Sequence, residues 1–155
     1  MKATGMLRKK QYFIGMDVGG TKIAAGLVTP QGKILLRKKM SVPLNAQSAV
    51  LGQMIRGLIK EILDETQVSV SSLYGIGLGI PGIVDPDSGK ILRTPNIKLA
   101  GYPLIQRLKK VFKTTVVLGN DVNLGVLGEK WLGAGKATKN LIGIWYTAYH
   151  YHLFF

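Results

Sequence analysis

Residues 15–22, which read Gly-Met-Asp-Val-Gly-Gly-Thr-Lys, decide how the rest of the chain is interpreted. Apolar runs flank the stretch on both sides, a pattern typical of the tight turn of a β-hairpin. Paired glycines accept positive φ angles and let a ligand approach bare backbone. The N–H groups and hydroxyl of Gly19, Gly20 and Thr21 therefore predict a cradle for phosphate. Asp17, at the mouth of the turn, is placed to hold a metal ion or its water.

Two better-known glycine motifs do not fit this turn. The Walker loop needs four residues between its first glycine and Gly-Lys-Ser/Thr and then a helix, whereas Thr21 and Lys22 follow a glycine pair and lead into a strand pattern. The dinucleotide fingerprint also requires a helix directly after its glycines. Taken alone, the stretch is equally compatible with an ordinary hairpin turn that carries a solvated aspartate. The later motifs decide between these two interpretations.

Length and composition bound the class of protein. The chain has 155 residues, 46% of them hydrophobic, which is enough for one domain with a sizeable core. No apolar run is long enough to span a membrane, and residues 1–11 lack the apolar stretch of a secretory signal. The absence of cysteine is compatible with a reducing compartment. We therefore expect a cytoplasmic protein that does not contact membranes.

The formal net charge is +13, which would suit a nucleic acid, an anionic lipid or a phosphorylated small molecule. The basic residues are scattered, and no aromatic residues interleave their short clusters as a stacking platform would require. We interpret them as a solvated basic surface and expect no nucleic-acid partner. Two of the eight carboxylates, Asp17 and Asp121, stand instead inside glycine-rich or asparagine-rich motifs.

Hydrophobic periodicity predicts the order of the elements. Three strands at 12–17, 23–28 and 33–42 form an antiparallel meander, and a helix follows from residue 46. A strand at 73–80, a helix from 103, a strand at 115–118, a helix at 122–132 and the start of a last strand at 140–144 complete the order. Such alternation predicts an α/β domain whose mixed sheet has an antiparallel edge followed by parallel strands.

Two details of the predicted helices are open to direct comparison with a structure. The helix that begins near Pro103 is expected to bury Leu104, Leu108, Val111 and Phe112. The helix at 122–132 contains Gly125 and Gly128, each costing up to about 1 kcal/mol relative to alanine, so we expect close packing there. Glycines at 133 and 135 are expected to end this helix.

Four motifs stand in a fixed order along the chain. They are Asp-Val-Gly-Gly-Thr-Lys at 17–22, Gly-Ile-Pro-Gly-Ile-Val-Asp at 79–85, Pro-Asn at 95–96, and Asn-Asp-Val-Asn-Leu-Gly-Val-Leu-Gly-Glu at 120–129 with Gly-Ala-Gly at 133–135. Over 12–144 this ordered set resembles the ROK family of sugar kinases, repressors and open reading frames, which has the actin-like ATPase (ribonuclease H-like) fold. The resemblance implies an N-terminal extension at 1–11, an actin-like lobe at 12–132, and the start of a second lobe at 133–155.

The resemblance also implies a reaction and its site residues. The reaction is ATP-dependent phosphorylation of a hexose or amino sugar, glucose at its 6-hydroxyl above all, with Mg²⁺ as the cofactor. The implied roles are ATP-phosphate binding by Gly19, Gly20, Thr21 and Lys22, Mg²⁺ binding through water by Asp17, sugar binding by Gly82, Asn96, Asn120 and Asp121, and general-base catalysis by Asp121.

These residue types suit phosphoryl transfer. The reaction depends on positioning and charge neutralisation, so backbone donors, a lysine and a metal-holding carboxylate belong at the ATP end. The acceptor hydroxyl needs a carboxylate to take its proton, and asparagine amides both donate to and accept from vicinal hydroxyls. Without the neighbouring motifs, Asp121 or Asn120 would be interpreted as an ordinary helix cap.

The chain departs from the family pattern near its end. Where relatives continue with a second glycine-rich phosphate loop, residues 145–155 read Trp-Tyr-Thr-Ala-Tyr-His-Tyr-His-Leu-Phe-Phe. The family's second-lobe sugar ligands and zinc site have no counterpart, and His150 and His152 are interpreted as part of a surface tail. Our hypothesis is that the reading frame shifts or is interrupted near Trp145, leaving a first lobe that is poorly active or inactive.

Two alternative functions stay open. One is a sugar-responsive transcriptional repressor of the same family, although the residues before Tyr12 are too few for a helix-turn-helix module. The other is a non-catalytic lobe that binds sugar or nucleotide. In either case, exposed lobe-interface surface is expected to promote homo-oligomers or other association.

Overall fold

The computed structural model describes residues 11–85, 87–147 and 150–154. The predicted N-terminal extension lies outside these residues except for Gln11. Within the described ranges, no helix is both long and apolar enough to cross a membrane.

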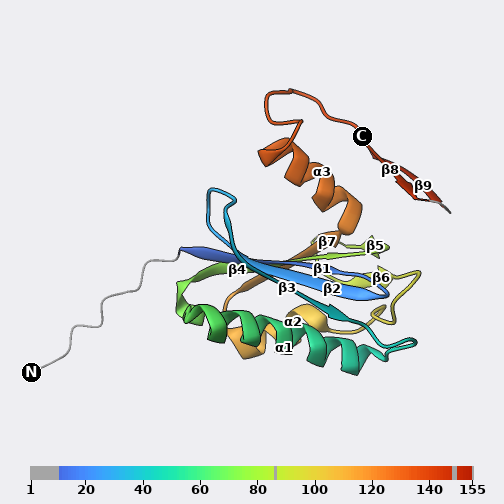
Figure 1. Cartoon of the computed structure of the whole chain (residues 1–155). Helices are drawn as coiled ribbons and strands as arrows, with labels where there is room; N and C mark the ends of the chain where they lie inside the picture. Colours follow the sequence, from blue (N-terminus) through green and yellow to red (C-terminus); the bar gives the residue numbers. More distant parts are fainter. Residues whose placement is uncertain (1–10, 86, 148–149, 155) are drawn as a thin grey trace, which may run out of the picture.

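A five-stranded mixed sheet forms the centre of the molecule (Figure 1). Its strand order is β3-β2-β1-β4-β7, with β1 (Tyr12–Val18), β2 (Lys22–Val28), β3 (Ile34–Ser41), β4 (Leu73–Ile80) and β7 (Thr115–Asn120). The first three strands pair antiparallel, whereas β4 pairs parallel to both β1 and β7. This arrangement confirms the predicted sheet.

Helices α1 (Ser48–Thr66) and α2 (Leu104–Phe112) cover one face of the sheet, below it in Figure 1. The short 3₁₀ helix η1 (Val70–Ser72) leads from α1 into β4. Helix α1 buries an apolar stripe of Leu51, Ile55, Leu58, Ile59, Ile62 and Leu63, whereas Val50, which has the same periodicity, is exposed. The buried side chains pack with the inward residues of the strands into one hydrophobic core.

The predicted core face of α2 is wrong at one position. Ile105 is buried, whereas Val111 is 42% exposed. At about 100° per residue, Leu104, Ile105, Leu108 and Phe112 form one stripe, and Val111 falls beyond its edge.

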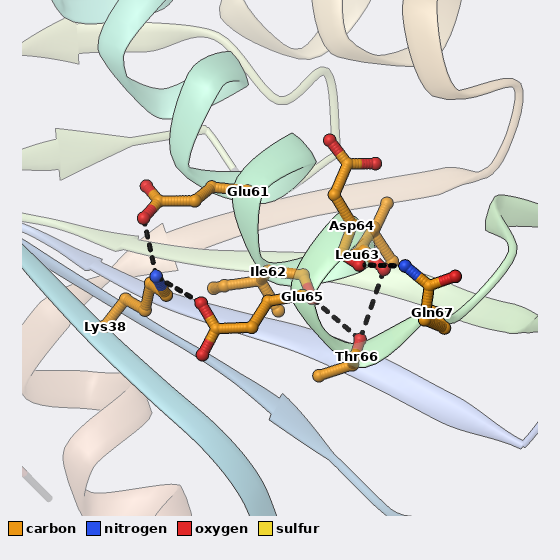
Figure 2. Close-up of polar contacts among 8 residues, drawn as sticks. All are labelled: Lys38, Glu61, Ile62, Leu63, Asp64, Glu65, Thr66 and Gln67. Carbon is orange, nitrogen blue, oxygen red and sulfur yellow. Dashed lines mark hydrogen bonds and ion pairs between the residues drawn. The ribbon is translucent and has the colours of Figure 1, made fainter.

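An ion pair joins β3 to α1 on the covered face (Figure 2). Lys38 Nζ lies 2.6 Å from Glu61 Oε1 and 2.5 Å from Glu65 Oε2. Its hydrogen bonds to Glu61 and then Glu65 raise the pKa of Lys38. The two glutamates are one helical turn apart, so a single cation on the strand neutralises both.

The segment between β4 and α2 contains a small hairpin that was not predicted, β5 (Ile83–Val84) and β6 (Ile91–Arg93). Asp85 orders its turn by accepting hydrogen bonds from the N–H groups of Asp87 and Ser88 and from the Ser88 hydroxyl. These bonds hold the pKa of Asp85 below its usual range. Asp85 therefore has a structural role in this motif.

Helix α3 (Asp121–Leu132) lies on the other face of the sheet, above it in Figure 1. The close packing expected at its glycines is not found at Gly128, where an added Cβ would meet no described atom within 4 Å. Gly133 ends the helix as predicted, and its N–H donates to the Glu129 carbonyl, although its φ is −101° and not left-handed.

The last predicted strand begins later than expected and joins a different sheet. Strand β8 (Gly143–Thr147) pairs antiparallel with β9 (His150–Phe154) in a separate two-stranded ribbon. His150 and His152, interpreted as part of a surface tail, lie in β9, a strand that was not predicted. Adjacent Leu153 and Phe154 interrupt the alternation of apolar and polar residues there, so periodicity did not predict a strand.

Candidate functional site

The carboxyl ends of the three parallel strands bring the predicted motifs to one edge of the sheet. Asp17 on β1 is in register with Gly79 on β4, and Gly79 is in register with Gly119 on β7. Asn120 and Asp121 follow directly. In open α/β sheets, ligands bind at this edge, beyond the carboxyl ends of the strands. Asp17 and Asp121 thus meet although 104 positions, 121 minus 17, separate them in the sequence.

The glycine turn is shaped by a close approach of backbone and not by positive φ. Among the described glycines, φ is positive at Gly32, Gly82, Gly89 and Gly101, so the expectation for the glycine pair at 19–20 is wrong. A Cβ atom placed on Gly20 would lie 2.7 Å from the Asn96 carbonyl oxygen. The Pro-Asn motif at 95–96 therefore packs directly on the tip of the hairpin, and glycine is needed for this contact.

The hairpin leaves two backbone donors at its tip as candidates for an anion. The N–H of Gly19 donates to the Lys22 carbonyl at 2.9 Å and is therefore occupied within the turn. The N–H groups of Gly20 and Thr21, with the Thr21 hydroxyl, are the remaining candidates. Thr21 and Lys22 are both exposed. The sequence prediction of three backbone donors is thus narrowed to two.

Asp17 lies in an electrostatic field set by charges from several elements. Loss of water around its carboxyl, followed by the negative charge of Asp121, raises the pKa of Asp17, whereas Lys22 and Arg37 lower it. The negative charge of Asp121 near Asp17 makes this edge favourable for a cation. Arg37, on β3, was not predicted as part of the site because no motif contains it.

Asp121 begins α3 directly at the sheet edge. An added Cβ on Gly79 would lie 3.4 Å from the Asp121 Cα, an ordinary contact distance, so α3 starts directly beside β4. Asp121 Oδ1 accepts a hydrogen bond from the Val122 N–H at 2.9 Å. This bond orients the carboxylate and leaves its second oxygen as the candidate acceptor for a substrate proton.

Asn120 has the capping role that was the alternative interpretation. Its side-chain oxygen accepts from the Asn123 N–H, and its amide nitrogen donates to the Gly82 carbonyl, both at 3.0 Å. Each bond uses only part of the capacity of the amide, so contact with a sugar hydroxyl remains chemically open. The bond to Gly82 connects two motifs that lie 38 residues apart in the sequence.

The backbone conformation at Gly82 requires glycine. Its φ is +112°, and an added Cβ would overlap the Arg93 carbonyl oxygen of β6. Glycine is therefore required at this turn on both grounds. The carbonyl of Gly82 points to Asn120, which brings the turn to the same edge as Asp121.

A hollow of about 610 Å³ adjoins the hairpin tip on the side of Asn96. It is bounded by the tip at 20–21, by the loop at 42–46 and by the loop at 94–98. In the second loop, the Thr94 hydroxyl donates to the Ile97 carbonyl at 2.5 Å. Neither loop was predicted as part of a site, except for Asn96, because their residues form no periodic or motif signal.

The residues of the site are compatible with Mg²⁺. Across the described ranges, no group of three or more His, Cys, Asp or Glu side chains forms a metal cluster. Mg²⁺ usually keeps several waters and binds through one or two carboxylates together with substrate phosphates. Asp17 beside the hairpin tip fits this pattern, because it supplies one carboxylate next to the candidate phosphate donors.

Comparison with known proteins gives a consistent family. A sequence model described as "ROK family" matches residues 13–146. The glucokinase of Halalkalibacterium halodurans is 38% identical over 136 residues, which cover 85% of this chain and 40% of that protein. The xylose repressor of Caldicellulosiruptor bescii is 30% identical over 83% of this chain and 32% of that protein.

Solved structures agree with the sequence comparison. A ROK family glucokinase from Streptomyces griseus, in complex with glucose and AMPPNP, superposes with a TM-score of 0.76 at 31% identity. The match covers 86% of this chain and 40% of that structure. The chain therefore spans less than half the length of each of these three proteins.

Proposed function

The chain belongs to the ROK family, and on this premise we propose that it is the sugar-binding and phosphate-binding lobe of an ATP-dependent sugar kinase, with a hexose such as glucose as the acceptor. The observation that carries the proposal is the meeting of Asp17 and Asp121 beside the glycine hairpin, at the carboxyl edge of the sheet. Glucokinases among the relatives support the choice of substrate.

At the ATP end, the chain contributes charge and backbone donors. The N–H groups of Gly20 and Thr21 bind phosphate oxygens, and the Lys22 ammonium neutralises part of their charge. Asp17 would hold Mg²⁺ through water, and the ion would neutralise the β- and γ-phosphates when bound.

At the sugar end, Asp121 acts as the general base. Its carboxylate takes the proton of the 6-hydroxyl as that oxygen forms a bond to the γ-phosphorus. The bond from the γ-phosphorus to the bridging oxygen then breaks, and ADP leaves with the electron pair. Asn96, Asn120 and the Gly82 turn contact the remaining hydroxyls and orient the ring.

A chimera tests the proposal. Residues 13–146 of this chain would replace the matched part of the Halalkalibacterium halodurans glucokinase, and ADP release would be followed with glucose and Mg²⁺-ATP. We expect turnover in the chimera and its loss by about a hundredfold or more in Asp121→Asn, with little change in the KM for glucose.

The conservative variant Asp121→Glu and circular dichroism control for misfolding. A folded chimera in which Asp121→Asn keeps full turnover would refute the role of Asp121. A folded chimera that binds glucose without any turnover would refute the kinase function.

A repressor is the second candidate, because the xylose repressor matches nearly the same share of this chain as the glucokinase. Both functions would use the sugar site. Sugar binding that survives Asp121→Asn, together with no ATP binding, would favour the repressor.

A further inference from the structure

A second hollow lies between α1 and α2, and nothing in the proposed reaction uses it. Its volume is about 250 Å³, and its walls come from the two helices, which lie on the same face of the sheet (Figure 1), and from Tyr102. It shares no wall residue with the hollow beside the hairpin tip. We call it the helix hollow, defined by Gly52, Arg56, Tyr102, Arg107, Leu108 and Lys110.

The helix hollow carries positive charge that the protein does not neutralise. Arg56, Arg107 and Lys110 line it, and all three are exposed. No Asp or Glu occurs at 18–60 or at 88–120, the two ranges that supply every wall residue. Within the described part of the chain, Lys38 alone lies within 4 Å of a carboxylate. The hollow therefore favours an anion.

One of these cations is held in place by an aromatic ring. A Cβ added to Gly52 would overlap the Tyr102 hydroxyl oxygen, so glycine leaves a notch in α1 that receives this side chain. The Arg107 Cζ lies 5.1 Å from the centre of the Tyr102 ring. This cation–π contact restricts the guanidinium without a hydrogen bond, so its N–H donors remain for a ligand.

The charges and their type select phosphate over carboxylate. The planar fork of arginine binds two phosphate oxygens at once, and lysine adds a further charge. A phosphomonoester carries about −1.5 to −2 charges at pH 7, whereas a single carboxylate would leave most of the positive charge uncompensated.

The apolar part of the wall selects an organic body for the ligand. Leu104 and Leu108 are buried and line the helix hollow beside the cations. Drug-sized ligands occupy pockets of about 300–1,000 Å³, so a hollow of about 250 Å³ suits a smaller molecule.

We propose that the helix hollow binds a small phosphomonoester, with its phosphate against the three cations and its apolar body on the two leucines. This site is separate from the phosphate donors at the hairpin tip and needs none of them. The inference goes beyond the proposed function and does not rest on it.

The amide of Gly52 provides a direct readout. The ¹⁵N-labelled 155-residue chain would be titrated with phenyl phosphate, and the amide signals followed by NMR. We expect a saturable shift at Gly52 and little change at Gly57, which is exposed on α1 outside the hollow. Benzoate has the same ring with a single carboxylate, and should bind at least about tenfold more weakly.

Matched variants locate the phosphate. Arg107→Gln should weaken the binding of phenyl phosphate by about tenfold or more. Lys109→Gln removes the same charge from an exposed position on α2 outside the hollow, and should change binding by less than about twofold. Arg56→Gln tests the other wall without touching the Tyr102 contact, so it remains informative where Arg107→Gln disturbs the fold.

The hairpin tip needs its own control, because it is the other candidate phosphate site of this chain. Lys22→Gln removes the lysine there and should leave the Gly52 titration unchanged. Inorganic phosphate, which lacks the apolar body, should shift the same amide with a weaker affinity than phenyl phosphate.

Four results would overturn the proposal. The first is that phenyl phosphate gives no saturable shift at Gly52 in the folded chain. The second is equal weakening by Arg107→Gln and Lys109→Gln, which indicates general attraction to a basic surface. The third is loss of binding in Lys22→Gln alone, which assigns the anion to the hairpin tip. The fourth is equal binding of benzoate. None of these results bears on the kinase function, since turnover is measured separately in the chimera.

Discussion

At the scale of single residues, Gly20 illustrates how the site depends on a contact between two loops. The loop at 94–98 reaches the hairpin tip only because Gly20 has no side chain. We expect Gly20→Ala to lower the free energy of unfolding by about 1–3 kcal/mol, since a methyl group 2.7 Å from the Asn96 oxygen forces the loop outward. Urea denaturation measures the change.

Gly15→Ala is the matched control for this prediction. Gly15 lies on β1 of the same hairpin, and an added Cβ meets no described atom within 4 Å. Its stability should therefore stay within about 0.5 kcal/mol of the parent chain. Equal losses in the two variants would show that the contact with Asn96 does not decide the role of Gly20.

The raised pKa of Asp17 leads to a prediction of how the stability of the chain depends on pH. Because its pKa is raised by desolvation and then by Asp121, the folded chain keeps this proton to a higher pH than the unfolded chain does. The contribution of Asp17 to stability therefore falls as pH rises from about 4 through the raised pKa. Asp17→Asn should flatten this fall and make the folded state relatively more stable at neutral pH.

Asp85 provides a control of opposite sign in the same denaturation series. Its pKa is lowered by hydrogen bonds from Ser88 and Asp87, so its contribution is present above about pH 4 and is lost as pH falls through the lowered value. Asp85→Asn should therefore reduce stability at neutral pH. A parallel response of the two variants would contradict the assignment of Asp17.

At the scale of elements, the ion pair of Lys38 is expected to stabilise the packing of β3 on α1. Removing the ammonium in Lys38→Met leaves Glu61 and Glu65 facing each other across one helical turn (Figure 2). The variant should be less stable than the parent, and added salt should narrow the difference by screening the repulsion. Thermal unfolding at low and high salt measures this.

Lys39→Met controls for a general effect of lost charge on β3. Lys39 is the next residue along the strand, so it lies on the opposite face and is exposed. Its loss should leave stability nearly unchanged. An equal, salt-independent loss in both variants would show that the ion pair contributes little.

At the scale of the whole molecule, the candidate site is open to water, since Asp17, Thr21 and Lys22 are all exposed. Phosphoryl transfer needs a closed site that positions both substrates and excludes water. We therefore expect the 155-residue chain alone to turn over at least about a hundredfold more slowly than the chimera described above. Coupled detection of ADP, with protein free of host kinases, measures both. Comparable rates would show that this lobe suffices.

Much of the fold was predictable because it depends on local pattern. The alternation in 12–42 and the helical period of α1 specify their elements directly, since a strand repeats every two residues and a helix every 3.6. Periodicity specifies the edge of a helical apolar stripe less sharply than its centre, which explains why Val111 on α2 was wrongly expected to be buried. The pairing of β8 with β9 was missed because the apolar period in that segment is interrupted.

The residues of the candidate site were also predictable from the sequence, whereas their contacts were not. The order of the motifs identified Asp17, Asp121 and the glycine turn, because residue type and spacing are properties of the sequence. The contact of Gly20 with Asn96, the bond from Asn120 to Gly82 and the position of Arg37 near Asp17 were decided only by the tertiary structure. The physical reason is that these contacts join distant segments, and their geometry depends on how the whole sheet packs and pairs.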